Sequence, residues 1–265
     1  MKHDMKPGFS SPSLFFRYKL SDPWPQGEGG SHTHSQFELI YFLRGDAVHI
    51  VEERKYPLTR GDLVIVRPQK YHDIVFSSPK EYERYNILFD AEALGLSEAF
   101  TVSERFEVVS LVSEPTTAAI FPKLEHYREH LAPEEFERAA VHLLYELFCD
   151  LSLLSPEGER PYSTLHPTLA SALSYIRENL FTVKSIGEVA DALRVTESYL
   201  FRLFRTELKT TPKKYLTDKR LVAADSLLRL GHRPTEVALE CGFSEYTTFF
   251  RAYKRMFGTS PTSRA

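Results

Sequence analysis

The sequence predicts an α+β protein of two domains, an N-terminal β-barrel with a helical dimerisation segment and a C-terminal all-α domain. Two observations predict this organisation. Short apolar runs alternate with Gly, Pro and Asp turn signals as far as about residue 89. The last hundred or so residues instead place apolar side chains at helical spacing and repeat one helix-turn-helix plan. We expect domains at 1–154 and 168–265, joined at 155–167 by a linker rich in Pro and charge.

The composition is that of a globular protein, and its charge is unevenly distributed. Of 265 residues, 42% are hydrophobic and 26% are charged. From Thr164 onward there are 16 Lys/Arg and 10 Asp/Glu, although the whole chain has a net charge of −3, so a basic module follows an acidic one. No stretch resembles a signal peptide or a membrane span, and Cys149 and Cys241 fall in different predicted domains. We therefore expect a cytoplasmic protein without a disulfide framework.

Five short apolar runs predict the strands of a small antiparallel barrel or sandwich that begins near Phe15. They are Phe37–Leu43, Val48–Val51, Leu63–Val66, Ile74–Phe76 and Asn86–Phe89. The pattern then becomes helical. Pro133–Leu154 is amphipathic, and Thr117–Leu131 predicts a second helix with Pro122 near its first turns. Two interpretations of these apolar stripes remain open, namely packing against the barrel and a helical interface of a homodimer.

The C-terminal segment predicts six helices. The first two are Leu169–Leu180 and Ile186–Leu193. Thr196 caps a third that runs to about Leu208. The fourth helix begins at Pro212 and ends before Gly231. The fifth begins at Pro234 and is broken by Gly242. Ser244 caps the sixth, which runs to Phe257.

Two pairs of these helices share one plan. In each pair a short helix, a tight turn and a second helix bury apolar residues toward one another, and Ala190 and Ala238 are small enough for the helices to cross closely. The inward residues are Ile186, Val189, Leu193, Leu200, Leu203 and Phe204 in the first unit, and Val237, Cys241, Phe249, Ala252 and Tyr253 in the second. A single such pair is common in proteins. Two in tandem within a basic segment favour DNA binding.

The second helix of each unit would enter the major groove of DNA. Its outward residues then contact bases, because Arg pairs with guanine, Ser and Thr suit several bases, and aromatic rings touch a thymine methyl. The expected base contacts are Ser198, Phe201, Arg202, Tyr246, Thr247, Phe250 and Arg251. The expected phosphate contacts are Thr196, Arg205, Lys209, Lys213, Ser244, Lys254 and Arg255.

These residues carry a resemblance to a known family. The run Thr196-x-x-x-Leu200-x-Arg202-x-Phe204-Arg205, and later Cys241-Gly242-Phe243, Phe249-x-Arg251-x-Tyr253-Lys254 and Phe257-Gly258-x-Ser260-Pro261, resemble the AraC/XylS family of bacterial regulators. In that family the positions of Ser198, Phe201, Arg202, Tyr246, Thr247 and Arg251 face DNA. The chain departs from the pattern at Pro234, at Thr196 and in a first turn without Gly. The resemblance implies a transcriptional regulator rather than an enzyme, with double-stranded DNA, a sugar-like effector and RNA polymerase as partners.

The N-terminal half resembles the cupin barrel through His32, His34, Glu38 and His72. Alternation along one strand would point His32, His34 and Glu38 to the same side, and His72 would join them from a later strand. Three interpretations remain open. The four groups bond to one another in a polar pocket wall, they contact a sugar-like effector together with Arg17, Trp24, Tyr41 and Arg84, or they bind a divalent metal such as Zn, Fe, Mn or Ni, as in cupin enzymes. A metal-dependent cupin enzyme is the alternative function, although no nucleophile–base pair supports it.

Overall fold

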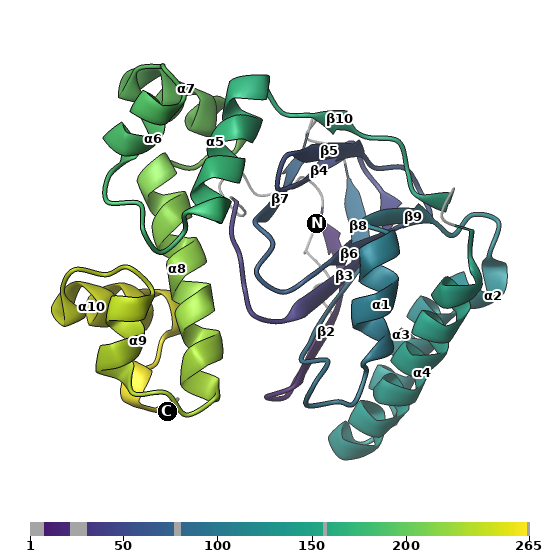
Figure 1. Cartoon of the computed structure of the whole chain (residues 1–265). Helices are drawn as coiled ribbons and strands as arrows, with labels where there is room; N and C mark the ends of the chain where they lie inside the picture. The colour runs from purple at the N-terminus through teal and green to yellow at the C-terminus, as the bar shows by residue number, and fades with distance from the viewer. Residues whose placement is uncertain (1–7, 22–30, 77–80, 156–157, 264–265) are drawn as a thin grey trace.

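The computed structural model describes residues 8–21, 31–76, 81–155 and 158–263. Within them the chain forms a β-rich N-terminal domain and a helical C-terminal domain, which confirms the predicted fold class (Figure 1). The two domains lie side by side, and the long helix α8 (Pro212–Arg229) runs along the boundary between them. None of the described helices is both long and apolar enough to cross a bilayer.

Two antiparallel sheets make the N-terminal domain. The larger sheet has six strands in the order β1 (Phe9–Ser10), β2 (Leu14–Ser21), β8 (Tyr82–Phe89), β3 (Phe37–Arg44), β6 (Asp62–Val66) and β9 (Val108–Ser110). The smaller sheet has the order β10 (Ser163–Thr164), β5 (Arg54–Pro57), β4 (Ala47–Val51) and β7 (His72–Phe76). Apolar residues from both sheets share one core, so the sheets enclose the interior of a barrel.

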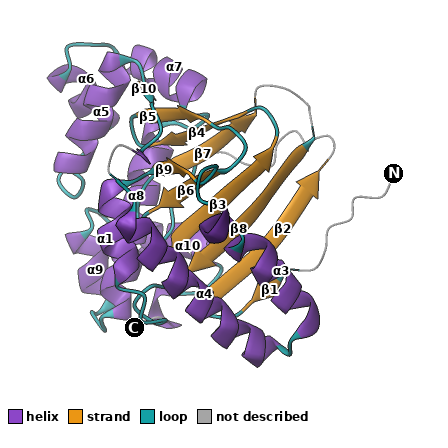
Figure 2. Cartoon of the chain, turned by 90° about the vertical axis from the view of Figure 1, so that its right-hand side faces the viewer, coloured by secondary structure: helices purple, strands orange, loops and turns teal. Residues whose placement is uncertain are grey.

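The larger sheet is buried on both faces, because alternate residues of a strand point to opposite sides. On β3, Ile40 and Phe42 point into the barrel and pack with residues of the smaller sheet. Leu39 and Tyr41 point to the other side, where they join a core shared with four helices. These helices are α1 (Glu98–Arg105), α2 (Pro115–Ala118), α3 (Ile120–His130) and α4 (Pro133–Leu153). Figure 2 shows α1, α3 and α4 lying across the sheet.

The predicted amphipathic helix at 133–154 is confirmed as α4, and its apolar stripe packs inside this chain. Phe136, Leu143, Leu147 and Leu151 of α4 are all buried in the core beneath the larger sheet. The second predicted helix is two helices, because the chain breaks at Ala119 between α2 and α3. Packing against the barrel thus accounts for the buried stripe of α4.

The C-terminal domain contains the predicted helices with bounds close to those expected. They are α5 (Pro167–Glu178), α6 (Ile186–Ala192), α7 (Glu197–Glu207), α8, α9 (Pro234–Glu240) and α10 (Tyr246–Phe257), followed by a 3-10 turn at Pro261–Ser263. The Thr196 hydroxyl accepts a hydrogen bond from the Tyr199 amide, which confirms it as the cap of α7. The cap predicted at Ser244 is wrong. Glu245 is the N-cap of α10 and makes no side-chain capping bond, because the turn ends one residue later.

The helical domain is docked on the smaller sheet of the barrel. Ile50 and Tyr71 of the barrel belong to the same apolar core as α5 and α8 residues. Within the predicted linker, Ser163–Thr164 pairs with β5 as an edge strand. The Leu165 amide then donates to the Glu53 carbonyl at 2.8 Å, so the chain stays tied to the barrel almost up to α5.

Candidate nucleic-acid interface and ligand pocket

The first helix-turn-helix unit consists of α6 and α7. Ala190 is buried where α6 meets α7, and Leu200 and Phe204 of α7 are fully buried against it. The turn between the helices holds Arg194 at φ +54°, the left-handed region in which glycine is usual. The first turn therefore keeps the expected geometry without a glycine.

The second unit consists of α9 and α10, with Gly242 in the turn at φ +77°. A Cβ at Gly242 would lie 2.5 Å from the carbonyl oxygen of Phe181 and 2.9 Å from the guanidinium carbon of Arg220. Val237, Ala238 and Phe249 fill the space between the two helices. The glycine thus supplies both the left-handed turn and a close approach to the first unit.

Arg220 joins the two units from the middle of α8. Its guanidinium donates to the carbonyl oxygens of Leu180 and Val183, which precede α6, at 2.8 and 2.6 Å. It also donates to the carbonyl oxygen of Gly242 at 2.9 Å. Because the side chain is buried, these three bonds fix the first unit against the turn of the second. The family motif in the sequence includes Arg220, but no contact was predicted for it.

The expected base-contacting residues lie on two exposed helix faces. Ser198 and Arg202 of α7 and Thr247 and Arg251 of α10 are exposed. Ser198 and Thr247 are the second residues of their helices, and Arg202 and Arg251 are the sixth. The two helices therefore present a hydroxyl and a guanidinium at equivalent positions. The remaining expected contacts, Phe201, Tyr246 and Phe250, are partly buried.

A basic groove separates the two units. It has a volume of about 950 Å³ and is lined by Lys184, Lys213, Ser244, Arg251 and Arg255, among others. The expected phosphate contacts Thr196, Arg205, Lys209, Lys213, Ser244, Lys254 and Arg255 are all exposed to solvent. Lys184, in the loop before α6, is a further cation that the sequence analysis missed. This arrangement suits a DNA backbone passing between the two major-groove helices.

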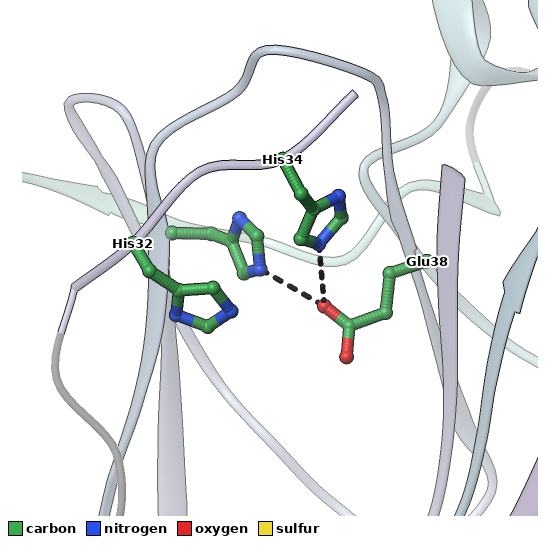
Figure 3. A group of neighbouring side chains, drawn as sticks. His32, His34 and Glu38 are labelled. Atoms are coloured by element: carbon green, nitrogen blue, oxygen red, sulfur yellow. Dashed lines mark hydrogen bonds and ion pairs between the residues drawn. The ribbon is translucent and has the colours of Figure 1, made fainter. Parts of the chain in front are cut away.

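In the N-terminal domain the four residues proposed as a polar cluster lie together. One potential ligand atom from each of His32, His34, Glu38 and His72 can be chosen so that all four lie within 4.8 Å of one another. Figure 3 shows the imidazoles of His32 and His34 turned toward the Glu38 carboxylate. The residues do not share one strand as predicted. His32 forms a single β-bridge with His72 of β7, and Glu38 lies on β3 in the other sheet.

Hydrogen bonds hold the Glu38 carboxylate at the centre of the cluster. Its Oε2 lies 2.9 Å from Nε2 of His72 and 3.4 Å from Nε2 of His34, and its Oε1 accepts from the Asn86 amide at 2.7 Å. Burial raises the pKa of Glu38, but the bonds from His34 and His72 outweigh it and hold the pKa well below its usual value. Burial lowers the pKa of His72, but Glu38 outweighs it and leaves the pKa above its usual value.

A cavity of about 430 Å³ opens from this cluster into the barrel. It is lined by Phe15, Lys19, His32, Glu38, Ile40, His72, Asp73, Ile74, Phe76, Arg84, Asn86 and Leu88. Four expected pocket residues line it, namely His32, Glu38, His72 and Arg84, whereas Lys19 and Asn86 were missed. The Asn86 Oδ1 and Arg84 Nε atoms are buried and make no hydrogen bond within the described residues. Such atoms are available to a polar ligand.

Two expected pocket residues lie elsewhere, and a third is not described. Tyr41 lies on the opposite face of β3 from Glu38, where it stacks on Phe121 of α3 with ring centroids 4.3 Å apart, and so it does not line this cavity. Arg17 lies over the Phe15 ring at 5.1 Å and is not among the residues that line the cavity. Trp24 lies outside the described residues.

A second cavity, of about 830 Å³, lies on the other side of the cluster between the domains. His32, Thr33 and His34 line its barrel side. Lys213, Lys214, Asp218 and Arg255 line its helical side. The histidine cluster therefore separates the interior of the barrel from the helices that carry the candidate phosphate contacts.

The chain is similar in sequence to known regulators. The family described as the AraC-like ligand binding domain matches residues 25–148, and that described as the helix-turn-helix domain matches residues 189–263. The HTH-type transcriptional activator RhaR of Salmonella dublin is 27% identical over 258 residues, or 92% of this chain and 89% of the relative. RhaR of Escherichia coli O1:K1 / APEC is 24% identical over the same shares.

Two solved structures give further comparisons. An AraC-type regulator from Chromobacterium violaceum is 31% identical, with a TM-score of 0.35, and the match covers 37% of this chain and 88% of that one. ToxT from Vibrio cholerae is 11% identical, with a TM-score of 0.40, and the match covers 96% and 97% of the two chains. The two family matches fall on the barrel with its helices and on the paired helix-turn-helix units.

Proposed function

The chain belongs to the AraC/XylS family of DNA-binding transcriptional regulators, and from that premise we propose that it reads a bipartite DNA site through α7 and α10. The observation that carries this proposal is the hydroxyl and guanidinium pair at equivalent positions of the two helices, Ser198 with Arg202 and Thr247 with Arg251. All four side chains are exposed. Each pair lies in the first turns of its helix, the part that reaches base edges in helix-turn-helix complexes.

In this proposal Arg202 and Arg251 donate to guanine, and Ser198 and Thr247 contact neighbouring bases. Phe201, Tyr246 and Phe250 supply the apolar contacts beside them. The exposed cations and hydroxyls around the basic groove contact phosphates and set the register without reading sequence. Helix α8 has 18 residues and so spans about 27 Å, which suits two reading helices placed about one DNA turn apart.

Selection of random-sequence DNA tests this proposal. The full chain is incubated with a random library at about 0.15 M salt and excess competitor DNA, which suppresses non-specific phosphate binding. We expect enrichment of a motif with two contact blocks about one helical turn apart. Enrichment of a single block would show that only one unit reads bases, and a library that stays random would refute sequence-specific binding.

The effector of this regulator is proposed to bind in the barrel cavity. The volume of about 430 Å³ lies within the range of small-molecule sites. Glu38 and Asn86 offer hydrogen bonds to hydroxyl groups, and Lys19 and Arg84 offer two positive charges. These groups favour a sugar or related metabolite, and the two cations favour one that carries a carboxylate.

Thermal denaturation with a panel of neutral sugars and sugar acids tests the effector class. An acid that binds should raise the melting temperature of the wild type and have little effect on Arg84→Gln. Arg233→Gln is the matched control, because Arg233 is exposed and remote from the barrel cavity. If a neutral sugar raised the melting temperature of Arg84→Gln as much as that of Arg233→Gln, Arg84 would not be the residue that selects an acidic effector.

We further propose that the protein is a homodimeric activator that acts on RNA polymerase. The relatives RhaR are named activators, and two-fold DNA sites commonly accompany dimers. The buried stripe of α4 is used within the chain, so the outer face of α4, where Tyr145 is exposed, is the proposed contact between protomers. Light scattering that finds only monomer at micromolar concentration would exclude the dimer. Transcription from a selected site with purified polymerase tests activation.

A further inference from the structure

The hydrogen bonds of two histidines in the cluster fix which ring nitrogen carries a proton. Nδ1 of His72 lies 2.9 Å from the carbonyl oxygen of Lys70, and Nδ1 of His34 lies 2.8 Å from that of Gln36. A carbonyl oxygen only accepts, so each Nδ1 must donate. In a neutral imidazole the other nitrogen, Nε2, then holds a lone pair. Both lone pairs point at the Glu38 carboxylate, which is itself an acceptor.

Groups that converge in this way need a positive charge among them, supplied either by protons on the imidazoles, as in the hydrogen bonds to Glu38 described above, or by a metal ion in their place. Histidines that bind metals commonly donate their other ring N–H to a backbone carbonyl, and this bond orients the ring and strengthens the ligand. His34 and His72 both have this arrangement. His32 completes the set, because its ring centroid lies 4.3 Å from that of His72 and 5.8 Å from that of His34. The cluster therefore offers three imidazoles and one carboxylate to a single point.

A second buried group lies beside the cluster. His49 of β4 is buried, and its ring centroid lies 6.3 Å from that of His72. Neither of its ring nitrogens makes a hydrogen bond within the described residues. A buried imidazole without partners is costly, and a water or ligand held by a neighbouring cation would satisfy it.

We propose that His32, His34, Glu38 and His72 bind one divalent first-row transition metal, and that the bound ion strengthens the docking of the helical domain on the barrel. Three nitrogen ligands and one oxygen ligand suit Zn²⁺, Ni²⁺ or Co²⁺ better than Mg²⁺ or Ca²⁺, which prefer oxygen. This proposal rests on the proposed role of the barrel as the sensor of the regulator. It makes a metal ion part of the signal that the barrel receives.

Two ligands are the sequence neighbours of residues that hold the other domain. Ser31, before His32, donates from its hydroxyl to the carbonyl oxygen of Leu208. Tyr71, before His72, donates to the hydroxyl of Thr210 at 3.2 Å and lies 3.4 Å from Asp218 Oδ2. The His32 and His72 backbones pair with each other, with N–O distances of 3.0 and 2.9 Å.

An ion held by His32 and His72 would therefore fix both segments at once. These segments contact residues 208–210, which connect the first reading helix α7 to α8. Any ligand that binds the docked arrangement more tightly than the separated one shifts the population toward docking. Metal occupancy would thus set the position of the first reading unit relative to the barrel.

Metal titration of the full chain tests the site. The protein is stripped with EDTA, desalted, and titrated separately with Zn²⁺, Ni²⁺ and Co²⁺ by calorimetry, with Co²⁺ absorption reporting the coordination geometry. We expect one equivalent to bind, and His34→Ala and Glu38→Gln to weaken binding at least tenfold. The control is His126→Ala, which breaks the surface pair His126 and His130 on α3, with ring centroids 4.3 Å apart. It should leave the affinity unchanged.

Two results would overturn the metal site. The first is a folded wild type that binds none of the three ions at about 100 µM. The second is binding that survives in His34→Ala and Glu38→Gln but disappears in His126→Ala, because the metal would then belong to the surface pair. Circular dichroism of each variant ensures that a loss of binding is not a loss of fold.

The proposed effect of the metal on domain docking is measured separately, by melting temperature and by proteolysis. Free metal at about 100 times its dissociation constant should raise the melting temperature of the wild type by roughly 5–10 °C and slow proteolysis at residues 158–166. Tyr71→Phe leaves the ligands intact, so it should keep one equivalent of metal but lose the metal-dependent protection from proteolysis. Metal binding with unchanged proteolysis in the wild type would refute the coupling.

DNA selection distinguishes this proposal from the proposed function. A chain that enriches a DNA motif but binds no metal refutes only the metal site. A chain that binds metal but enriches no motif refutes only sequence-specific DNA reading.

Discussion

The guanidinium of Arg220 donates to the carbonyl oxygen of Gly242 at 2.9 Å, across the boundary between the two helix-turn-helix units. Two further bonds from Arg220 reach the loop before α6. A single buried side chain on α8 thus sets the relative position of the two DNA-reading helices. The orientation of the tandem units depends on this contact as well as on the length of α8.

Arg220→Met should destabilise the protein and loosen the two reading helices. Three buried carbonyl oxygens would lose a charged donor, so we expect a loss of about 3 kcal/mol in the free energy of unfolding. Urea denaturation measures it. Arg233→Met is the control, because Arg233 is 82% exposed and should change stability by less than about 0.5 kcal/mol. Equal effects of the two substitutions would contradict the structural role of Arg220.

Gly242→Ala should destabilise the protein more than Gly258→Ala. Both glycines have left-handed φ values, +77° and +72°, so each alanine carries a backbone cost of about 1 kcal/mol. At Gly258 no atom lies within 4 Å of the added methyl, whereas at Gly242 the methyl meets the Phe181 carbonyl and Arg220. The difference between the two melting temperatures isolates the steric term. A Gly242 variant no less stable than the Gly258 variant would exclude the close approach.

Arg251→Ala should weaken discrimination at one or two base pairs by about 1–3 kcal/mol. Lys254→Ala, on the same helix, should weaken binding on every sequence and reduce the slope of log affinity against log salt by about 1. Quantitative binding to the selected site and to single-base variants at three salt concentrations measures both effects. A uniform loss in Arg251→Ala would place Arg251 on a phosphate instead.

Glu52→Gln should weaken the docking of the two domains. The buried Glu52 carboxylate accepts from the Tyr215 hydroxyl at 3.0 Å and from the ammonium of Lys219, which is 12% exposed. Removing the charge leaves Lys219 without its charged partner, with only the Gln69 carbonyl oxygen at 2.8 Å, so we expect a loss of about 3 kcal/mol in the free energy of unfolding at pH 7. Glu53→Gln is the control, because its ion pair with Arg177 is largely exposed and should contribute less than about 1 kcal/mol.

The effect of Glu52→Gln should also depend on pH. Burial raises the pKa of Glu52, but Lys219 outweighs it and holds the pKa below its usual value. A carboxyl with a lowered pKa in the folded state contributes stability above its unfolded pKa of about 4.3 and loses it as the pH falls through the folded value. The difference in unfolding free energy between wild type and variant should therefore be complete at pH 7 and smaller at pH 3.5. If the difference in unfolding free energy between wild type and variant grew toward acidic pH, Glu52 could not be the ionised partner of Lys219.

The periodicity of the sequence predicted most of the fold. Apolar alternation identified β3, β4, β6, β7 and β8, and helical spacing identified α4 and the six helices of the C-terminal domain. The elements β1, β5, β9, β10 and α1 were missed. The strands β1, β9 and β10 have only two or three residues each, too few to show a period. Ser244 was a wrong cap because the sequence offers a hydroxyl there, whereas the turn ends at Glu245.

The sites were partly accessible from the sequence. Residue types and spacing indicated the four cluster residues, but the strand that was expected to align them is absent: the chain crosses from one sheet to the other between His32 and Glu38. Tyr41 could have been excluded from the cavity that Glu38 lines, because it lies three positions after Glu38 on one strand and must face the other way. The contacts of Arg220 and Glu52 depend on how distant segments pack, and no local pattern encodes them.

The pairing of β10 with β5 limits how far the sensor and the reader can separate. The Arg160 amide donates to the Val108 carbonyl at 2.8 Å, and α5 begins only seven residues later, at Pro167. If the two-residue strand and the bond at Leu165 opened, the freed chain would extend to at most about 25 Å. The helical domain can therefore pivot beside its own barrel but cannot diffuse away from it. Its local concentration at the barrel stays high in every state, and redocking remains an intramolecular event.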